Sequence, residues 1–357
     1  MKLKKILVVL PFVIITVAIG IFIFYNFNLS KVSNDKTLKK IEIKQGTIES
    51  IGRTLKENNL IRDIKMFKIY VKLSGKNNLQ ASTYMLSENM GTRKIVKILE
   101  KGKSDNPDEI FLTFKEGINM RDIIKLISEN TNNNEEDIIK LLDSKDYLDE
   151  LIGKYWFLGD EIKNPKIYYS LEGYLFPATY DYINKDIDVK VIFKDMLDKM
   201  DEKISKYKSE IEQSEFNVHE ILTIASLVES EGANIEDRKN IAGVFYNRLK
   251  KHITLGSDVT TYYGLKINMG DRALTSSELS QCNDYNTRCL KFFGLPIGPI
   301  SIPSIESIEA AIEPEKHDYL YFVADKNKKT YFTKNITEHN KLLKKLKKDN
   351  MFYEHGE

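Results

Sequence analysis

Residues 216–232 read FNVHEILTIASLVESEG, and they carry the start, body and stop signals of one apolar helix. Asn217 suits the N-cap position, and Glu220, three residues later, completes a capping box. Gly232 is a natural stop at the C-terminal end. Because the positions between these signals are almost all apolar or small, we expect the helix to be buried at the centre of its domain.

Two acids close this helix, and they lie on different faces of it. Glu231 continues the apolar series of Ile224 and Leu227, so a carboxyl stands where the pattern calls for another apolar side chain. Partial burial raises the pKa of a carboxyl, as a general acid requires near neutral pH. Glu229 lies about 200° away around the helix, beside smaller neighbours. The periodicity therefore favours Glu231 as an acid catalyst, and two solvated carboxylates at a helix end are the structural alternative.

The N-terminus carries a membrane signal. A nearly continuous apolar run fills residues 6–26, which is the length of a transmembrane helix. Three lysines in residues 1–5 favour a cytoplasmic tail, with the rest of the chain on the outer face of the cell membrane. A cleaved signal peptide is the alternative, but the run continues past the small residue Gly20, where a cleaved peptide becomes polar. We expect a retained, single-pass anchor.

A small module follows a short polar linker. Two strand-like segments, residues 41–43 and 82–86, enclose two helical stretches, so residues 39–105 have a βααβ order. Carbohydrate docking and a simple spacer are both compatible with that pattern. Residues 106–200 form a mixed connecting region, and the predicted fold class of the whole chain is α+β.

The composition argues against several classes of protein. The chain has 54 basic and 52 acidic residues, whereas a general nucleic-acid binder carries a one-sided excess of positive charge. Its five histidines are scattered without an HExxH pairing, so neither a metal ion nor another cofactor is expected. Cys282 and Cys289 are too few for a zinc framework, and the sequence leaves open whether they form a disulfide.

Further motifs follow the apolar helix. In order, the motifs are ASLVESE (225–231), Arg238, VFYNRL (244–249), LGSDVT (255–260), YNT (285–287), GLPIGPI (294–300), YLYFVAD (319–325) and EHN (338–340). This ordered set covers about half the chain and resembles the YceG-like family of endolytic murein transglycosylases. Any one of these motifs would be weak evidence, but the ordered set is specific.

The resemblance implies a lytic transglycosylase, a carbon–oxygen lyase that acts on peptidoglycan. It implies a LysM-like wall-binding module at residues 39–105, a mainly helical catalytic domain at residues 201–346, and Glu231 as the catalytic residue. Such an enzyme cleaves the bond between N-acetylmuramic acid and N-acetylglucosamine in nascent strands and terminates glycan elongation. One carboxyl acts first as acid and then as base, and the sugar's own 6-hydroxyl attacks, which leaves a 1,6-anhydro end.

Eight residues are candidates to hold the sugar and its N-acetyl groups. They are Arg238, Asn247, Arg248, Asp258, Thr260, Tyr285, Asn286 and Thr287. For each of them, a structural role such as capping or turn-making is the alternative to ligand contact.

Two other functions stay open. One is a muramidase-type hydrolase that uses water, with Asp258 or Glu229 as its second carboxylate. The other is a non-catalytic scaffold that binds the wall and holds cell-wall synthesis proteins. The expected partners are peptidoglycan strands, the membrane and cell-wall synthesis proteins, and no nucleic acid.

Overall fold

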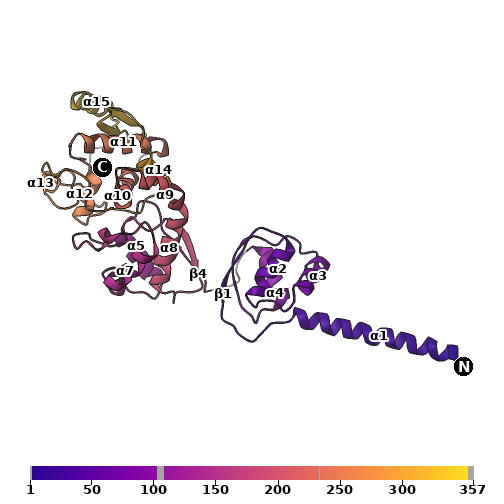
Figure 1. The fold of residues 1–357 in the computed structure, drawn as a ribbon. Coiled ribbons are helices and arrows are strands. Elements are labelled where there is room, and N and C mark those ends of the chain that lie inside the picture. The colour runs from indigo at the N-terminus through magenta and orange to yellow at the C-terminus, as the bar shows by residue number, and fades with distance from the viewer. Residues whose placement is uncertain (1, 103–107, 233, 353–357) are drawn as a thin grey trace. The chain divides into compact units, whose positions relative to one another are not determined.

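The structure of the chain is a computed structural model with two compact units. It describes residues 2–102, 108–232 and 234–352, with side chains from residue 16 onward. Unit 1 is Met1–Glu109 and unit 2 is Ile110–Glu357 (Figure 1). Helices and antiparallel strand pairs make up both units, so the predicted α+β class is confirmed.

Unit 1 has the predicted βααβ order, followed by one more helix. Its elements are α1 (Lys2–Leu29), β1 (Lys39–Ile43), α2 (Ile48–Glu57), α3 (Ile64–Ser74), β2 (Ser82–Leu86) and α4 (Gly91–Lys101). The strands β1 and β2 pair antiparallel, with Ile41 opposite Tyr84. Ile41 and Ile43 are buried and Glu42 between them is exposed, as in a strand that covers a core with one face. Side chains of α2, α3 and α4 complete that core.

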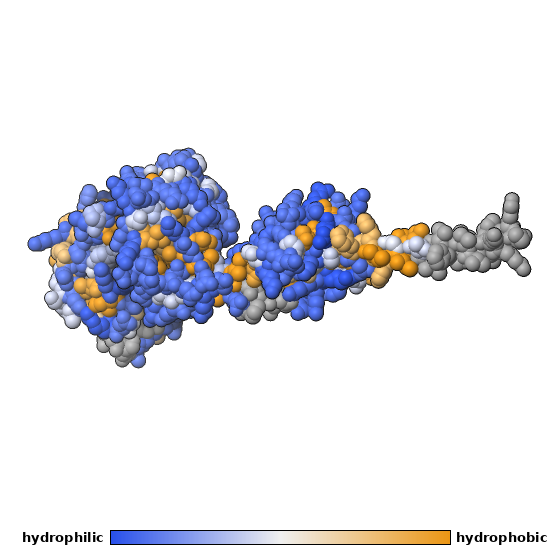
Figure 2. Space-filling model, turned by 90° about the horizontal axis from the view of Figure 1, so that it is seen from below, coloured by the Kyte–Doolittle hydropathy of each residue, from blue (hydrophilic) through white to orange (hydrophobic). Residues whose placement is uncertain are grey.

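Helix α1 contains the predicted membrane segment, residues 6–26. The side chains of residues 6–15 lie outside the described part of the chain. Beyond them, apolar side chains are exposed along the helix, among them Ile21 and Phe22 at 64% and 68%, and Figure 2 shows them gathered there. Within the described residues, no helix combines the length and the apolar character that a membrane span requires.

Unit 2 is mainly helical. Its first half contains β3 (Ile110–Thr113), α5 (Met120–Asn130), α6 (Glu135–Leu142), α7 (Lys145–Lys154), the 3-10 turn η1 (Asp160–Lys163), β4 (Thr179–Tyr182), α8 (Val189–Ile204), η2 (Ser205–Tyr207) and α9 (Lys208–Glu212). Its second half contains α10 (Val218–Ser230), α11 (Ile235–Lys250), α12 (Asp258–Gly264), α13 (Ser276–Ser280), α14 (Ile305–Ile312), β5 (Tyr321–Ala324), β6 (Thr330–Thr333) and α15 (Ile336–Lys348). The pairs β3–β4 and β5–β6 are antiparallel.

Helix α10 lies at the centre of unit 2, as its sequence predicts. The nine residues from Ile221 to Glu229 are all buried, and the helix packs against α11, α12 and α14 (Figure 1). The capping box is present, since the Asn217 side chain accepts from the backbone N–H of Glu220 at 3.0 Å and the Glu220 carboxylate accepts in return at 2.9 Å.

One hydrophobic core extends through unit 2. It includes Ile123 of α5, Met196 of α8 and Ile224 of α10, so it takes side chains from both residues 106–200 and residues 201–346. The division of the chain at residues 200 and 201 stays a prediction. Helix α10 is part of this shared core, which fixes the position of the helix end within unit 2.

Candidate active site

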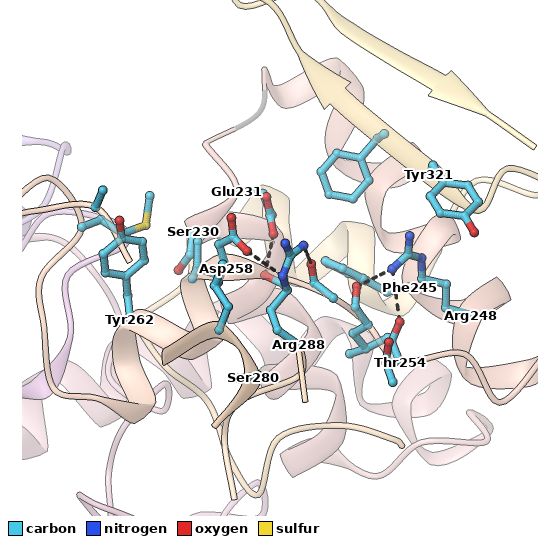
Figure 3. A pocket seen from close by; sticks show the side chains of 18 of the residues that line it. Ser230, Glu231, Phe245, Arg248, Thr254, Asp258, Tyr262, Ser280, Arg288 and Tyr321 are labelled. Atoms are coloured by element: carbon cyan, nitrogen blue, oxygen red, sulfur yellow. Dashed lines mark hydrogen bonds and ion pairs between the residues drawn. The ribbon is translucent and has the colours of Figure 1, made fainter. Parts of the chain in front are cut away.

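A cavity of about 1160 Å³ opens at the C-terminal end of α10. Its wall comes from α10, α11, α12, α13, β5, α15 and the loops between them. Its charged and aromatic lining includes Glu231, Arg248, Asp258, Arg288, Phe245, Tyr262 and Tyr321 (Figure 3). His339 of α15 also lines it. Across the described residues, no three or more histidine, cysteine, aspartate or glutamate side chains form a group that could hold a metal ion.

Glu231 is the residue that caps the end of α10. Gly232 follows with φ +65°, a left-handed conformation that suits glycine, and turns the chain away from the helix axis. The Glu231 side chain is half-buried in the cavity wall, where its Oε1 accepts a hydrogen bond of 2.6 Å from Ser257 Oγ. The end of a buried helix therefore holds one carboxyl at the edge of an open cavity.

The surroundings of Glu231 favour its protonated form. Burial away from water raises the pKa of the carboxyl to about 7. The hydrogen bond from Ser257 opposes this rise in pKa, and the negative charge of Asp258 adds to it. The guanidinium groups of Arg248 and Arg288 also oppose it. Near neutral pH the group can both give and accept a proton, as acid–base catalysis requires.

Glu229, the other acid of the pair, has a structural position. It is 9% exposed, and both its oxygens bind Arg238, at 3.0 and 3.1 Å. It also accepts hydrogen bonds from the Ser304 N–H at 3.0 Å and from Ser307 Oγ at 2.9 Å. These contacts tie α10 to α11 and α14. Glu229 is not among the described residues that line the cavity.

Arg248 and Asp258 are the two predicted binding residues that line the cavity with Glu231. Arg248 donates from Nε to the Leu320 carbonyl at 2.6 Å, and its guanidinium lies 4.8 Å from the centre of the Tyr321 ring. The Asp258 carboxylate forms an ion pair with Arg288 Nε at 3.0 Å. Both side chains therefore present fixed charge to the cavity beside the protonatable carboxyl.

Thr260, Asn286 and Thr287 are fully buried behind the cavity wall. The Thr260 hydroxyl donates to the Ser257 carbonyl at 2.7 Å, and Thr287 Oγ1 accepts from the Ser257 N–H at 3.0 Å. Asn286 donates from Nδ2 to the Gln281 carbonyl at 2.6 Å. These contacts support the structural alternative for all three residues. Those of Thr260 and Thr287 hold the backbone of Ser257, and that of Asn286 holds the end of α13.

The other three predicted binding residues lie away from the cavity. Arg238 is the partner of Glu229. Asn247 donates to the carbonyls of His317 and Tyr319 at 2.8 and 3.0 Å, and it lines a separate cavity of about 520 Å³. Tyr285 is buried, and its ring packs against two other tyrosine rings with centroid distances of 4.7 and 4.8 Å.

Among the cavity residues that the sequence did not identify as site residues, Ser257, Arg288 and Tyr321 contact predicted ones. Ser257 directly precedes Asp258, Arg288 directly follows the YNT motif, and Tyr321 stands inside YLYFVAD, so their only sequence signal is that they lie in or beside the motifs.

The structure also answers the open question about the cysteines. Cys282 and Cys289 form a disulfide, which closes the loop that contains Arg288.

The fold and the cavity define an α+β protein with a protonatable carboxyl at the end of a buried helix. The chain belongs to the YceG-like family, whose model matches residues 41–345. It is 36% identical over 329 residues to the endolytic murein transglycosylase of Bacillus subtilis (strain 168), covering 91% of this chain and 90% of the relative. It is 34% identical over 326 residues to that of Streptococcus pneumoniae serotype 2 (strain D39), covering 87% of this chain and 58% of the relative.

A solved structure supports the same assignment. The crystal structure of a yceG-like protein from Listeria monocytogenes matches with a TM-score of 0.60 and 36% sequence identity. The match covers 86% of this chain and 100% of the other. The similarity therefore extends over both sequence and fold.

Proposed function

We propose that this protein is a membrane-anchored, endolytic lytic transglycosylase. It cleaves the bond between N-acetylmuramic acid and N-acetylglucosamine in nascent peptidoglycan strands, and the 1,6-anhydro ends that it leaves terminate glycan elongation. The observation that carries the proposal is the Glu231 carboxyl at the cavity, with its pKa raised to about 7. Membership in a family whose curated relatives are named endolytic murein transglycosylases supports it.

The chemistry needs one group that gives a proton and then takes one back. Protonated Glu231 donates to the glycosidic oxygen while the bond from that oxygen to the anomeric carbon breaks. The resulting carboxylate accepts the proton of the 6-hydroxyl while the 6-oxygen bonds to the anomeric carbon. No water is consumed, and Glu231 regains its proton. A pKa of about 7 suits both halves of this cycle.

The cavity has room for sugars on both sides of the bond to be cut. Its volume of about 1160 Å³ exceeds the roughly 300–1,000 Å³ that is usual for small-molecule sites. In Figure 3, Tyr262 lies on one side of Glu231 and Tyr321 on the other. Aromatic side chains offer apolar faces with a polar tip, which suit the mixed surface of a sugar ring. This arrangement supports cuts within a strand.

The alternative enzyme is a hydrolase with Asp258 as its second carboxylate. The position of Asp258 in the same cavity favours that alternative, because a hydrolase needs a second carboxylate to activate water or to attack the anomeric carbon. Its ion pair with Arg288 favours a role in charge balance instead. The chemistry of the released ends decides between the transglycosylase and the hydrolase, because only the hydrolase leaves reducing ends.

We also propose that residues 39–105 are a LysM-like, wall-binding module. The antiparallel pair β1–β2 with α2 and α3 between its strands supports this proposal. A variant in which only residues 39–105 are deleted should sediment less with insoluble peptidoglycan than the intact chain. It should still cleave soluble glycan strands. Unchanged sedimentation would exclude wall binding by the module.

The membrane anchor, residues 6–26, leads to a topological prediction. A reporter enzyme fused after the C-terminus should be active only on the outer face of the membrane, and a reporter fused before residue 1 only in the cytoplasm. A soluble species without residues 6–26 in the medium would overturn the anchor.

The proposed partners of this chain are cell-wall synthesis proteins. In intact cells, cross-linking on the outer face of the membrane should capture such proteins with this chain. Cross-linking that captures no synthesis protein would exclude those partners.

The raised pKa of Glu231 predicts a pH dependence. Glu231 must be protonated in the free enzyme to act as the acid, so kcat/KM should fall as the pH rises through about 7. The measurement is the rate of fragment release from soluble, uncrosslinked glycan strands as a function of pH. A fall centred near the ordinary pKa of glutamate, about 4.3, would contradict this assignment.

A further inference from the structure

Ser257 stands at the N-cap of α12 but does not cap it. Serine is favoured at N-caps because its hydroxyl accepts from the first backbone N–H groups of the helix. Ser257 makes no such bond in α12. Its hydroxyl donates instead to Glu231 Oε1 at 2.6 Å, although the residue is only 4% exposed. The Ser257 hydroxyl therefore contacts the proposed catalytic carboxyl instead of capping α12.

Buried contacts hold the backbone of Ser257 from both sides. Its N–H donates to Thr287 Oγ1 at 3.0 Å, and its carbonyl accepts from Thr260 Oγ1 at 2.7 Å. The two threonine hydroxyls are bonded to each other at 2.9 Å. The disulfide between Cys282 and Cys289 closes the segment that contains Thr287. A group held in this way can fix the orientation of another side chain.

We propose that Ser257 is a positioning residue for Glu231, and that its hydroxyl occupies Oε1 so that Oε2 exchanges the proton with the substrate. The inference rests on the proposed function of Glu231. A hydroxyl that donates to one carboxyl oxygen fixes the rotation of the group and favours the acidic proton on the other oxygen. The same bond stabilises the carboxylate that remains after proton transfer.

The proposal has a signature in pH that a merely structural role lacks. Three charged groups act on the Glu231 carboxyl, namely Asp258 of α12, Arg248 of α11 and Arg288 of the disulfide-closed loop. The other titratable or charged residues that line the same cavity are His339 of α15, Tyr321 of β5, Tyr262, Asp271 and Arg272. Removal of the serine hydroxyl leaves all of these groups in place. It takes away a hydrogen bond that lowers the carboxyl pKa, so the pKa of Glu231 should rise further.

The test compares three variants of the full chain. Ser257→Ala removes the hydroxyl, and Ser257→Thr keeps one. Thr223→Val is the matched control, because it removes a buried hydroxyl from α10 itself, where Thr223 Oγ1 donates to the His219 carbonyl at 2.7 Å. For each variant, strand cleavage is measured against pH, and the Glu231 carboxyl is titrated by NMR, with Glu231→Gln assigning its signal.

Ser257→Ala should cleave strands roughly 10- to 100-fold more slowly below neutral pH, because the Glu231 carboxyl is no longer fixed in the orientation for proton transfer. The fall of its activity at high pH should move to higher pH, and its carboxyl should titrate at higher pH. Ser257→Thr and Thr223→Val should keep the wild-type profile. An unmoved titration in Ser257→Ala overturns the proposal. If the wild-type protein shows no strand cleavage that depends on Glu231, the proposed function is overturned instead. The titration of the carboxyl still tests the hydrogen bond between Ser257 and Glu231 in that case.

Discussion

Glu231→Gln is expected to lower strand cleavage by roughly a thousandfold or more, because the group serves as both acid and base. Glutamine keeps the size of the side chain, and its oxygen can still accept the hydrogen bond that Ser257 donates to Oε1. It has no proton to transfer at neutral pH. The measurement is the initial rate of fragment release by the purified full chain, with circular dichroism to verify the fold.

The control for that variant is Glu236→Gln. Glu236 lies in the first turn of α11, is exposed and does not line the cavity. The same chemical change there should leave the rate of cleavage unchanged. Wild-type rates of cleavage in Glu231→Gln protein would overturn the assignment of Glu231 as the catalytic acid. Absence of strand cleavage in the wild-type protein would instead favour the scaffold function.

The largest effect on stability is expected at Arg238. Arg238→Met leaves the Glu229 carboxylate buried without its bidentate partner, at a site where the two side chains are only 11% and 7% exposed. Breaking a buried ion pair on one side costs about 3–5 kcal/mol in the free energy of unfolding. Chemical denaturation monitored by circular dichroism measures this loss.

Lys239 supplies a matched control on the same helix. Its ion pair with Glu313 is exposed, at 47% and 65%, so Lys239→Met should cost about 1 kcal/mol or less. The comparison also tests whether Arg238 binds substrate. If its role is structural, Arg238→Met protein that is still folded should cleave strands with the wild-type KM. A large rise in KM without loss of stability would restore the predicted binding role.

Much of the fold could be predicted because its signals are local. The cap, the apolar body and the glycine stop of α10 all lie within residues 216–232, and the structure confirms each of them. The alternation of Ile41 and Ile43 likewise identified β1. The pairing of β3 with β4 could not be predicted, because Ile110 and its partner Tyr182 are far apart in the sequence and the contact depends on the whole core.

Of the candidate site, the sequence predicted the position of Glu231 because that signal is also local. The position of Glu231 at the cavity follows from helical periodicity, which places it on a face different from that of Glu229. The predicted binding residues lie in motifs without a comparable periodic pattern, so the sequence did not show which of their side chains face the cavity. Thr260 and Thr287 stand beside the site in the sequence, but only their partners in space show that they hold Ser257. No sequence signal distinguishes Ser257 from a serine that caps the helix after it, so its contact with Glu231 could not be predicted.

The most direct test of the proposed mechanism is mass spectrometry of the fragments released in isotopically labelled water. The purified full chain is mixed with uncrosslinked glycan strands, and Glu231→Gln protein is the blank. If the 6-hydroxyl is the nucleophile, the new ends are 1,6-anhydro-N-acetylmuramic residues, one water lighter than reducing ends and free of the label. If the major fragments carry ordinary reducing ends with labelled oxygen, water is the nucleophile, and the transglycosylase mechanism is contradicted.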